Sequence, residues 1–502
     1  MAPPALSPLL ALALIASASA QYLTPSDLPT DPAPNPIVLG HWFVIPAADF
    51  EGLRTLNPFL TDEQLANVKS GAECDTRADE DYCSELPAFF SGLGLSALAD
   101  DGIRLMGVTD NGPFGTCPAP AEDEPPLPAG VRQSAYFVPA FAPTISEFRI
   151  DQEAGGMALE KTCFFKGPDG EPLNGLPNTD RDDVPMEAGC ETEIDRSPNG
   201  IDPEDIHRIP GTDLCLGGDE YSPSAIVFNC NFESEDCGTV MIRYVPEGLE
   251  LPGASYEVRS NLPSAILNRR KGRGIESAAV SPDGKSAYLL LQSAMGPNKN
   301  ATSELSHTIH VVKLDITNPM DAKVAGLFLY IAEDIDLWVG TEKPADTKIS
   351  AAFWASEFVD SDNDVLVVLE RSVKQVKLFL ADFTNATDVV DSPMNTNLTF
   401  DNLGLFDETL SKLEGFGISP AKKAIFLDTG NVTEPLIEGW DSTDKQEGVV
   451  LLNKCVVAMA NDNDFGEGLS EASSVTVVHL DTCVDEVYDA LKASGSSRKL
   501  LL

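Results

Sequence analysis

The chain has 502 residues, and its 79 acidic and 34 basic residues give a formal net charge of −45 at pH 7. So large an excess of negative charge repels nucleic acid and anionic membrane surfaces, so we expect neither as a partner. The length allows one large all-β domain or two to three smaller domains.

The first twenty residues have the features of a secretory signal. They form an apolar run that ends in Ala18-Ser19-Ala20, a typical small-residue cleavage site. The alternative, a membrane anchor, is disfavoured because the run is short and interrupted by proline. No other segment of the sequence could span a bilayer. We therefore predict a signal peptide over residues 1–20 and a secreted, extracellular protein.

Ten cysteines, an even number, fit an oxidising compartment. None lies in a C-x-x-C pair, so zinc is not expected. Spacing does not determine connectivity, but local pairing predicts the bridges Cys74–Cys83, Cys163–Cys190, Cys230–Cys237 and Cys455–Cys483, which leaves Cys117 and Cys215. Four glycosylation sequons agree with secretion: Asn300, Asn385, Asn397 and Asn431.

Residues 21–89 read as an extended, proline-rich linker followed by the first strands. After them comes a loose hairpin over residues 91–112, whose second strand ends at Asp110. The clearest hairpin follows at residues 200–223, where Pro210-Gly211 makes the turn. The start of one antiparallel strand lies beside the end of the next, so Glu204 should meet Asp219. Two carboxylates about 4 Å apart repel by about 4 kcal/mol, so a cation, a proton or an arginine must offset the repulsion.

The same pattern recurs further along the chain. Glu276 opens a hairpin that ends at Gln292, 16 residues later, and Glu447 opens one that ends at Asp462, 15 residues later. A looser copy covers residues 348–371. Repeated sheet units of this kind are typical of propeller blades. We therefore predict an all-β fold, a single β-propeller of six or seven blades with disulfide-bonded loops, in which the polar hairpin ends converge on one mouth.

Three further segments complete the prediction. Residues 413–416 and 424–428 are expected to form a structural strand pair, and Val475 to Leu480 is expected to pair back to the N-terminal region, as propellers commonly close. The tail from Val484 begins as a short helix. The predicted organisation is thus a signal peptide (1–20), an N-terminal segment (21–89), the propeller domain (90–483) and a C-terminal tail (484–502).

A basic cluster, Arg269-Arg270-Lys271-Gly272-Arg273, stands out in so acidic a chain. One interpretation is a surface patch that pairs with nearby acidic residues. The other is a site for an anionic substrate group, because guanidinium groups match the geometry of phosphate. On the second interpretation Arg269, Arg270 and Arg273 bind substrate.

Six blocks of sequence resemble a known family. Among them are Gly200-Ile201-Asp202-Pro203-Glu204, Arg269 to Glu276, and Asn461 to Gly466. Over about 90–470, and in the same order, they are similar to the phytase-like family described as "esterase-like activity of phytase". The resemblance implies a β-propeller whose acidic residues are placed to hydrolyse phosphodiesters or related esters. The chain departs from the family pattern at Asn111, where arginine is usual, and at Ser277, where glycine is usual.

The acidic residues at the hairpin ends suggest a metal site, because calcium prefers carboxylate and amide oxygens. The predicted Ca²⁺ ligands are Glu204, Asp219, Glu276, Glu370, Glu447, Asn461 and Asp462. Asp110, Glu220 or Asp464 is expected to be the general base, and Arg371 to bind an oxyanion or to pair with a nearby acid. The alternative role for each acid is a strand-end cap or a turn residue.

Three hypotheses for function follow. The first is a secreted calcium-dependent phosphoester hydrolase. The second is a calcium-dependent lactonase or carboxylesterase, and the third is a non-catalytic propeller whose calcium stabilises the fold. The expected partner is a small-molecule phosphoester or ester substrate, and a monomer is favoured. The sequence contains no serine-nucleophile elbow and no phosphate-binding glycine loop.

Overall fold

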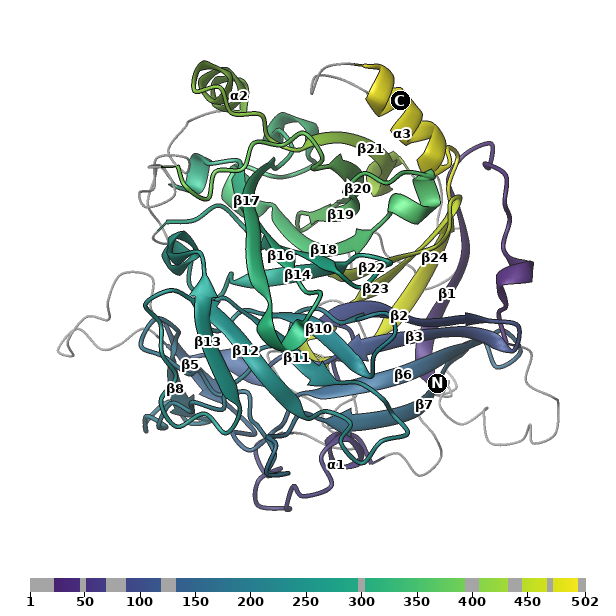
Figure 1. Ribbon diagram of the computed structural model, residues 1–502. Coiled ribbons are helices and arrows are strands. Elements are labelled where there is room, and N and C mark those ends of the chain that lie inside the picture. The colour runs from purple at the N-terminus through teal and green to yellow at the C-terminus, as the bar shows by residue number, and fades with distance from the viewer. Residues whose placement is uncertain are drawn as a thin grey trace, which may run out of the picture.

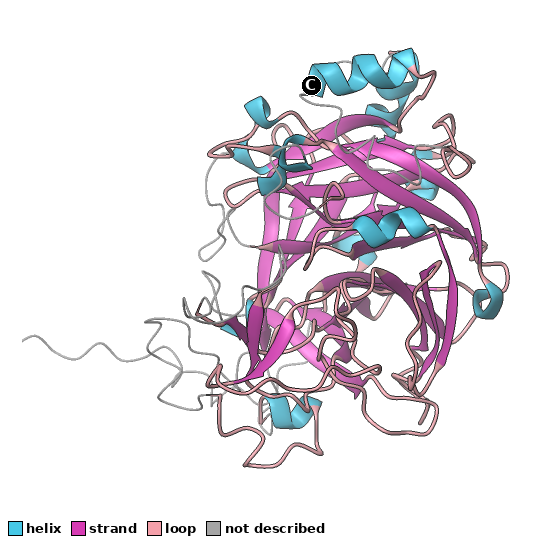
Figure 2. Cartoon of the chain, turned by 90° about the vertical axis from the view of Figure 1, so that its left-hand side faces the viewer, coloured by secondary structure: helices cyan, strands magenta, loops and turns pink. Residues whose placement is uncertain are grey.

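The computed structural model describes residues 22–45, 51–68, 87–118, 132–296, 303–392, 406–431, 445–466 and 473–494. β-Strands dominate this part of the chain, and the helices lie at its periphery (Figures 1 and 2). The α-helices are α1 (Leu53–Leu56), α2 (Phe406–Gly415) and α3 (Val484–Ala493).

Most of the strands form five groups, each of which is a mainly antiparallel run of neighbours. The first group is β2 (Gly92–Ala99), β3 (Gly102–Val108), β6 (Thr144–Asp151) and β7 (Gly156–Phe164). The second group is β9 (His207–Arg208), β10 (Leu214–Asp219), β11 (Ser224–Asn229), β12 (Val240–Pro246) and β13 (Glu257–Leu262). The third group is β14 (Ile275–Val280), β15 (Ser286–Leu291), β16 (Thr308–Asp315) and β17 (Lys323–Ile331).

The fourth group is β18 (Lys348–Trp354), β19 (Val365–Arg371), β20 (Val376–Asp382) and β21 (Lys422–Asp428). The fifth group is β22 (Gln446–Asn453), β23 (Val456–Asn461), β24 (Ser474–His479) and β1 (Ile37–Ile45). A separate small sheet contains β4 (Phe114–Thr116), β5 (Gln133–Tyr136) and β8 (Val184–Glu187). A short parallel pairing of β1 with β7 joins the first and fifth groups into one eight-stranded sheet.

The groups are arranged around a common centre. Their first strands contact one another in the order β2, β9 with β10, β14, β18, β22 and back to β2, and these strands surround the middle of the molecule (Figure 1). This is a propeller-like arrangement, as the repeated hairpins predicted. The described strands form five such groups, so the expected count of six or seven blades is not confirmed.

The N-terminal strand closes the ring. β1 pairs with β24 in antiparallel register, with Trp42 opposite Val475, while β24 pairs on its other side with β23. The predicted return of the strand near Val475 to the N-terminal region is therefore confirmed. Because the two ends of the ring are joined by a sheet ladder, opening the ring breaks backbone hydrogen bonds as well as apolar contacts.

The core lies between the faces of neighbouring groups. β19 illustrates this arrangement, because five consecutive side chains, on both faces of the strand, are fully buried: Val365, Leu366, Val367, Val368 and Leu369. A continuous run of β-branched and aliphatic residues fits a strand that is covered on both faces. One large cluster of buried side chains connects the second, third and fourth groups, and other clusters connect the remaining neighbours.

The predicted strand pair at residues 413–416 and 424–428 is wrong in its first half. Residues 406–415 form helix α2, and only β21, the outer strand of the fourth group, matches the prediction. The segment is rich in strong helix formers, and Leu410 and Leu413 lie on one face at helical spacing. α3 begins at Val484, as predicted, and buries Val487, Tyr488 and Leu491 against the sheets.

Four disulfides connect the described segments: Cys117–Cys190, Cys163–Cys237, Cys215–Cys230 and Cys455–Cys483. The predicted Cys455–Cys483 bridge is confirmed. The predicted Cys163–Cys190 and Cys230–Cys237 bridges are wrong, because strand pairing brings Cys215 of β10 beside the end of β11 and so captures Cys230. Cys74, Cys83 and residues 1–20 lie outside the described residues.

Among the described helices, none has the length and apolar character needed to cross a membrane.

Candidate functional site

One cavity of ≈ 200 Å³ lies where the hairpin ends meet. Residues from all five groups line it, which fits the expectation that the ends converge on one mouth. Its acidic residues are Asp110, Asp182, Asp183, Asp202, Glu204, Glu220, Glu447 and Asp464. Its basic residues are Arg132, Lys348 and Lys445, and Phe114, Tyr136 and Tyr221 supply aromatic surface.

Glycines bring the first strands close together around this cavity. A Cβ atom added to Gly448, which follows Glu447, would lie 2.3 Å from Cβ of Leu93 on β2. A Cβ atom added to Gly274, two residues before Glu276, would lie 2.3 Å from the main-chain oxygen of Glu220. Both separations are shorter than van der Waals contact allows, so only glycine lets the neighbouring chains approach this closely.

Three carboxylates form what we call the metal cluster: Asp202, Glu204 and Glu220. One oxygen from each lies within 4.8 Å of the others, and all three residues are buried. Asp202 and Glu204 precede β9, and Glu220 follows β10, so a single hairpin brings the three together. The main-chain N–H of Glu204 donates to the carbonyl of Gly218 (3.1 Å), which fixes this register.

The metal cluster lacks internal charge compensation. Within the described part of the chain, no lysine or arginine nitrogen lies within 4.0 Å of its carboxylate oxygens. Burial raises the pKa of all three groups, and repulsion from neighbouring carboxylates raises the pKa of Asp202 and Glu204 further. At Glu220 the more distant charges of Arg269, Lys348 and Arg273 oppose this rise without forming an ion pair. Ser91 donates one hydrogen bond to Glu204 (2.7 Å), but Oε1 of Glu220 is buried without a hydrogen-bond partner.

Asn111 adds an amide oxygen beside this cluster. Its main-chain N–H donates to Asp202 (3.1 Å), and its side-chain Nδ2 donates to the hydroxyl of Tyr221 (2.8 Å). Its Oδ1 is buried without a hydrogen-bond partner, and the residue lines the cavity. The departure from the family pattern at Asn111 thus places an unpaired amide oxygen, rather than a guanidinium group, at this wall of the cavity.

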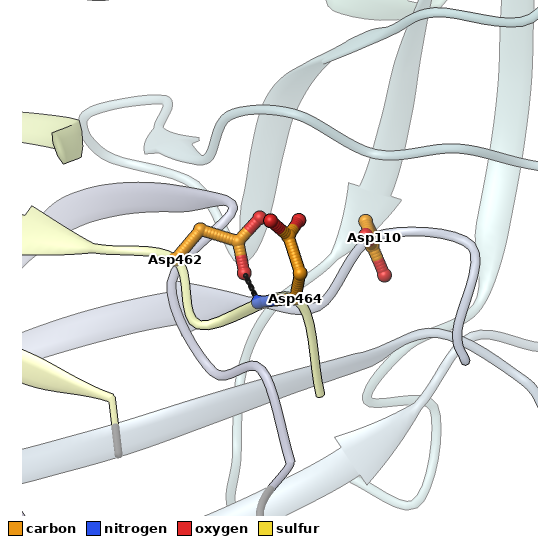
Figure 3. A group of neighbouring side chains, drawn as sticks. All are labelled: Asp110, Asp462 and Asp464. Carbon is orange, nitrogen blue, oxygen red and sulfur yellow. Dashed lines mark hydrogen bonds between the residues drawn. The ribbon is translucent and has the colours of Figure 1, made fainter. Parts of the chain in front are cut away.

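A second acidic cluster contains Asp110, Asp462 and Asp464 (Figure 3). Unlike the metal cluster, it contains a cation, because the ammonium group of Lys445 lies 2.7 Å from both Asp462 and Asp464. The main-chain N–H of Gly112 donates to Oδ1 of Asp110 (2.9 Å). Burial raises the pKa of Asp110 to about 7, against the opposing effects of the Gly112 hydrogen bond and of the charge of Lys445.

Glu447 lies beside the second cluster and is paired twice. It accepts a hydrogen bond from Nη2 of Arg371, and its Oε2 lies 2.8 Å from Nζ of Lys445. Burial opposes ionisation, but the charges of Lys445, Arg371 and Lys348 hold the pKa of Glu447 well below its usual range. Arg371 therefore pairs with an acid, which was one of the two roles expected for it.

The predicted meeting of Glu204 with Asp219 is wrong by one residue, because the hairpin pairs Pro203 with Asp219, and Asp219 does not line the cavity. Nη2 of Arg243 donates to its Oδ1 (2.8 Å), and both side chains are fully buried. The main-chain N–H of Asp202 donates to its Oδ2 (3.3 Å). An arginine thus offsets the expected repulsion at Asp219, and we leave Asp219 out of the ligand set.

The remaining predicted ligands have protein partners. Glu276 is buried and accepts a hydrogen bond from Gln292 (2.5 Å). Glu370 accepts from Tyr330 (2.5 Å) and pairs with Lys423 (2.6 Å). Asn461 accepts from the main-chain N–H of Ser474 (2.6 Å). None of the three lines the main cavity, so each fits the alternative role of a strand-end partner better than that of a ligand.

The basic cluster is divided by the fold. Arg269 is buried and forms an ion pair with Asp182. Nη1 of Arg273 donates to the main-chain oxygen of Ala345 (2.8 Å), and Arg270 lines a separate cavity of ≈ 10 Å³. The interpretation of a patch that pairs with nearby acids therefore fits Arg269. None of the three lines the main cavity.

Among the cavity residues that sequence reasoning missed are Asp202, Lys348 and Lys445. Asp202 and Lys445 each stand two positions before a residue that was predicted, Glu204 and Glu447. Alternate positions of an extended chain point to the same side, so this spacing was an available signal. Lys348 opens β18 and carries no such signal. Burial, with the charges of Arg371 and Arg273, lowers the pKa of Lys348 to about 8.

Comparisons with known proteins agree with the sequence blocks. A family model described as "Phytase-like: Esterase-like activity of phytase" matches residues 91–465. No match was found among curated proteins.

Solved structures give only distant similarities. A periplasmic gluconolactonase of Pseudomonas aeruginosa is 13% identical over 59% of this chain and 68% of its own, with a TM-score of 0.27. A protein from Lactobacillus plantarum is 10% identical over 76% of this chain and 78% of its own (TM-score 0.26). The protein U3-55K is 10% identical over 79% of this chain and 96% of its own (TM-score 0.29). Similarities this distant carry no inference about function.

Proposed function

Because this chain belongs to the phytase-like family, which is described by the esterase-like activity of phytase, we propose that it is a calcium-dependent phosphoester hydrolase. The observation that carries the proposal is a pair of opposite charges on one cavity, neither of which has a direct ion-pair partner in the segments that the structure describes. The metal cluster has three carboxylates without a cation, and Lys348 has no carboxylate oxygen within 4.0 Å among the described residues. A phosphoester suits both, because its anionic oxygens bind a cation and an ammonium group alike.

The donors of the metal cluster fit calcium. Calcium takes six to eight oxygens at roughly 2.3–2.6 Å, so two oxygens on opposite sides of one ion lie about 5 Å apart. The ligand atoms of Asp202, Glu204 and Glu220 lie within 4.8 Å of one another, which is inside that limit. The unpaired oxygens of Glu220 and Asn111 would complete their bonding in such a site. We therefore propose these four residues as the calcium ligands.

The proposed chemistry is attack of water on phosphorus. When bound, calcium supplies Lewis-acid polarisation of a phosphoryl oxygen and offsets its developing charge. Lys348 binds a second anionic oxygen and orients the substrate. Asp110, whose pKa of about 7 suits a general base, accepts a proton from the attacking water as the new P–O bond forms. The ester P–O bond breaks, and the leaving alcohol takes up that proton from Asp110.

A substrate panel tests this proposal. The purified protein, with its disulfides intact, is assayed on an aryl phosphomonoester and an aryl phosphodiester in calcium buffer and in excess EGTA. We expect the wild-type protein to hydrolyse substrate in calcium buffer and to lose this activity in EGTA. The Glu220→Gln substitution should reduce the activity in calcium buffer at least 100-fold. The matched control, Glu153→Gln at an exposed turn position, should retain wild-type activity. Turnover that persists in EGTA, or no turnover of either substrate, contradicts the proposal.

The same panel, extended to a lactone and an aryl carboxylester, separates the two other hypotheses. The family's description names an esterase-like activity, which favours the lactonase or carboxylesterase hypothesis as the second candidate. Calcium-dependent turnover of these esters alone would support it. A fold that melts at lower temperature in EGTA but hydrolyses no substrate would instead support the non-catalytic, calcium-stabilised propeller.

We further propose that the protein acts outside the cytosol, as a secreted monomer processed after residue 20. Its four disulfides support this, because structural disulfides persist in oxidising compartments. Asn385 lies in an exposed turn, where its sequon is accessible to glycosylation. The proposal also includes the predicted organisation of the mature chain. It comprises an N-terminal segment (21–89), a propeller domain of six or seven blades (90–483) and a C-terminal tail (484–502).

A further inference from the structure

The second acidic cluster has the geometry of a metal site. One oxygen each from Asp110, Asp462 and Asp464 lies within 4.8 Å of the others, the same limit that holds in the metal cluster. Figure 3 shows the three carboxylates gathered from two segments far apart in the sequence. The main-chain N–H of Asp464 donates to Oδ1 of Asp462 (2.9 Å), which fixes the loop that carries both.

Lys445 already supplies a cation there. Its Nζ lies 2.7 Å from Oδ2 of Asp462, 2.7 Å from Oδ1 of Asp464 and 2.8 Å from Oε2 of Glu447. It donates hydrogen bonds to Asp462 and Asp464, and its contact with Glu447 is an ion pair. A metal ion at this cluster would compete with Lys445 for the carboxylates of Asp462 and Asp464.

The chain sequence explains why this lysine stays in place. Lys445 immediately precedes β22, and Asp462 follows the paired strand β23, so the hairpin itself holds the two together. The main-chain N–H of Asp462 donates to the carbonyl of Lys445 (2.8 Å), which adds a backbone bond to the ion pair. The metal cluster has no equivalent, since no described lysine or arginine lies within 4.0 Å of it.

We propose that Lys445 takes the place of a second metal ion, so that the cavity binds one divalent cation rather than two. The lysine stays paired with Glu447, Asp462 and Asp464 at any calcium concentration, because a covalently attached ammonium group is removed neither by dilution nor by a chelator. Asp110 then keeps one oxygen free of a metal. The inference shares its cavity with the proposed function but does not depend on which ester is hydrolysed.

Metal stoichiometry tests this inference. The wild-type chain and Lys445→Met are titrated with CaCl₂ by isothermal calorimetry, and bound calcium is measured by atomic emission after equilibrium dialysis. We expect one ion per wild-type chain and two per Lys445→Met chain. The matched control is Lys348→Met, which removes one positive charge from the same cavity but breaks no ion pair with a described carboxylate. This variant should still bind one ion.

Each outcome has a defined meaning. Two ions per wild-type chain, or no additional ion in Lys445→Met, overturns the inference. If the wild type binds no ion and Lys445→Met binds one, the inference holds while the calcium site of the proposed function fails. If Lys445→Met unfolds without metal, circular dichroism is recorded against calcium concentration. Recovery of the fold in 10 mM CaCl₂ supports the replacement of lysine by a metal ion, and failure to recover overturns it.

Discussion

Arg243 is the buried cation on which the geometry of the metal cluster depends. All five of its N–H donors are used: Nε bonds Ser224, Nη1 bonds the carbonyl of Gly200 and the hydroxyl of Tyr256, and Nη2 bonds Asp219 and the carbonyl of Tyr221. These acceptors come from the segments on either side of Asp202 and Glu220. Arg243 therefore positions two proposed calcium ligands without touching the cavity.

Replacing Arg243 with methionine should lower the free energy of unfolding by about 3–5 kcal/mol, because it leaves the carboxylate of Asp219 buried and unpaired. That is a third to a half of the stability of a typical domain. The matched control is Arg259→Met on β13. Its pairs with Glu257 and Asp321 are partly exposed, so the loss there should stay below about 1 kcal/mol.

The pH dependence of this loss follows from Asp219. Burial raises the pKa of Asp219 to about 6 even with Arg243 beside it, and removal of the arginine raises it further. A carboxyl group whose pKa is higher in the folded state binds more protons when folded, so its contribution to stability falls as pH rises between the unfolded and folded pKa values. The penalty of Arg243→Met should therefore be larger at pH 8 than at pH 5.

Urea denaturation under non-reducing conditions measures these values at both pHs. Adding Asp219→Asn to Arg243→Met removes the unpaired charge but keeps an oxygen for the N–H of Asp202, so the double variant should regain about 1–2 kcal/mol at pH 8. The argument is refuted if Arg243→Met costs no more than Arg259→Met, or if the double variant is no more stable than Arg243→Met alone.

Three further predictions concern the metal, the ring and the C-terminal helix. In EGTA the protein should melt at a lower temperature at pH 8 than at pH 5, because the pKa values of the buried metal cluster are raised. In saturating calcium this dependence of the melting temperature on pH should disappear. Gly448→Ala should cost about 1–3 kcal/mol in urea denaturation through its clash with Leu93, whereas Gly189→Ala, with no atom within 4 Å of the added Cβ, should be neutral. Replacing Cys455 and Cys483 with serine removes a disulfide between residues 28 positions apart in the sequence. The free energy of unfolding in urea should fall by roughly 3–4 kcal/mol. An unchanged urea midpoint would contradict this prediction.

The sequence predicted the repeated hairpins because each one is local. In the three clearest copies an acid, an apolar strand, a turn and a second strand follow within about twenty residues, and strand pairing then fixes which ends meet. That the segment around Glu204 lies beside the end of β10 could be deduced in this way, although the register pairs Pro203 with Asp219. The return of β24 to β1 could also be anticipated, since a sheet ring needs a closing pair.

Partners from other hairpins could not be deduced. Asp219 and Glu220 are neighbours in the sequence and alternate in direction, so one points to Arg243 and the other to the cavity. Nothing local identifies Arg243, which lies 24 residues away on β12. The disulfides show the same limit, because Cys163 pairs with Cys237 at a separation of 74 residues. Sequence spacing indicates which residues are placed at the mouth, but the register of the whole sheet decides what each one contacts.

The distribution of counter-charges, more than the number of acids, distinguishes the candidate ligand site from its surroundings. Each acid buried near the cavity costs desolvation energy, and the fold offsets that cost with an arginine at Asp219, a lysine at Asp462 and both at Glu447. A carboxylate that already pairs with an arginine or a lysine attracts a further cation only weakly. The metal cluster is the one described group of three neighbouring carboxylates on this cavity with no lysine or arginine nitrogen within 4.0 Å of its oxygens. We therefore expect a cation from solution to bind most strongly at the metal cluster, where the acids have no directly paired cation among the residues described.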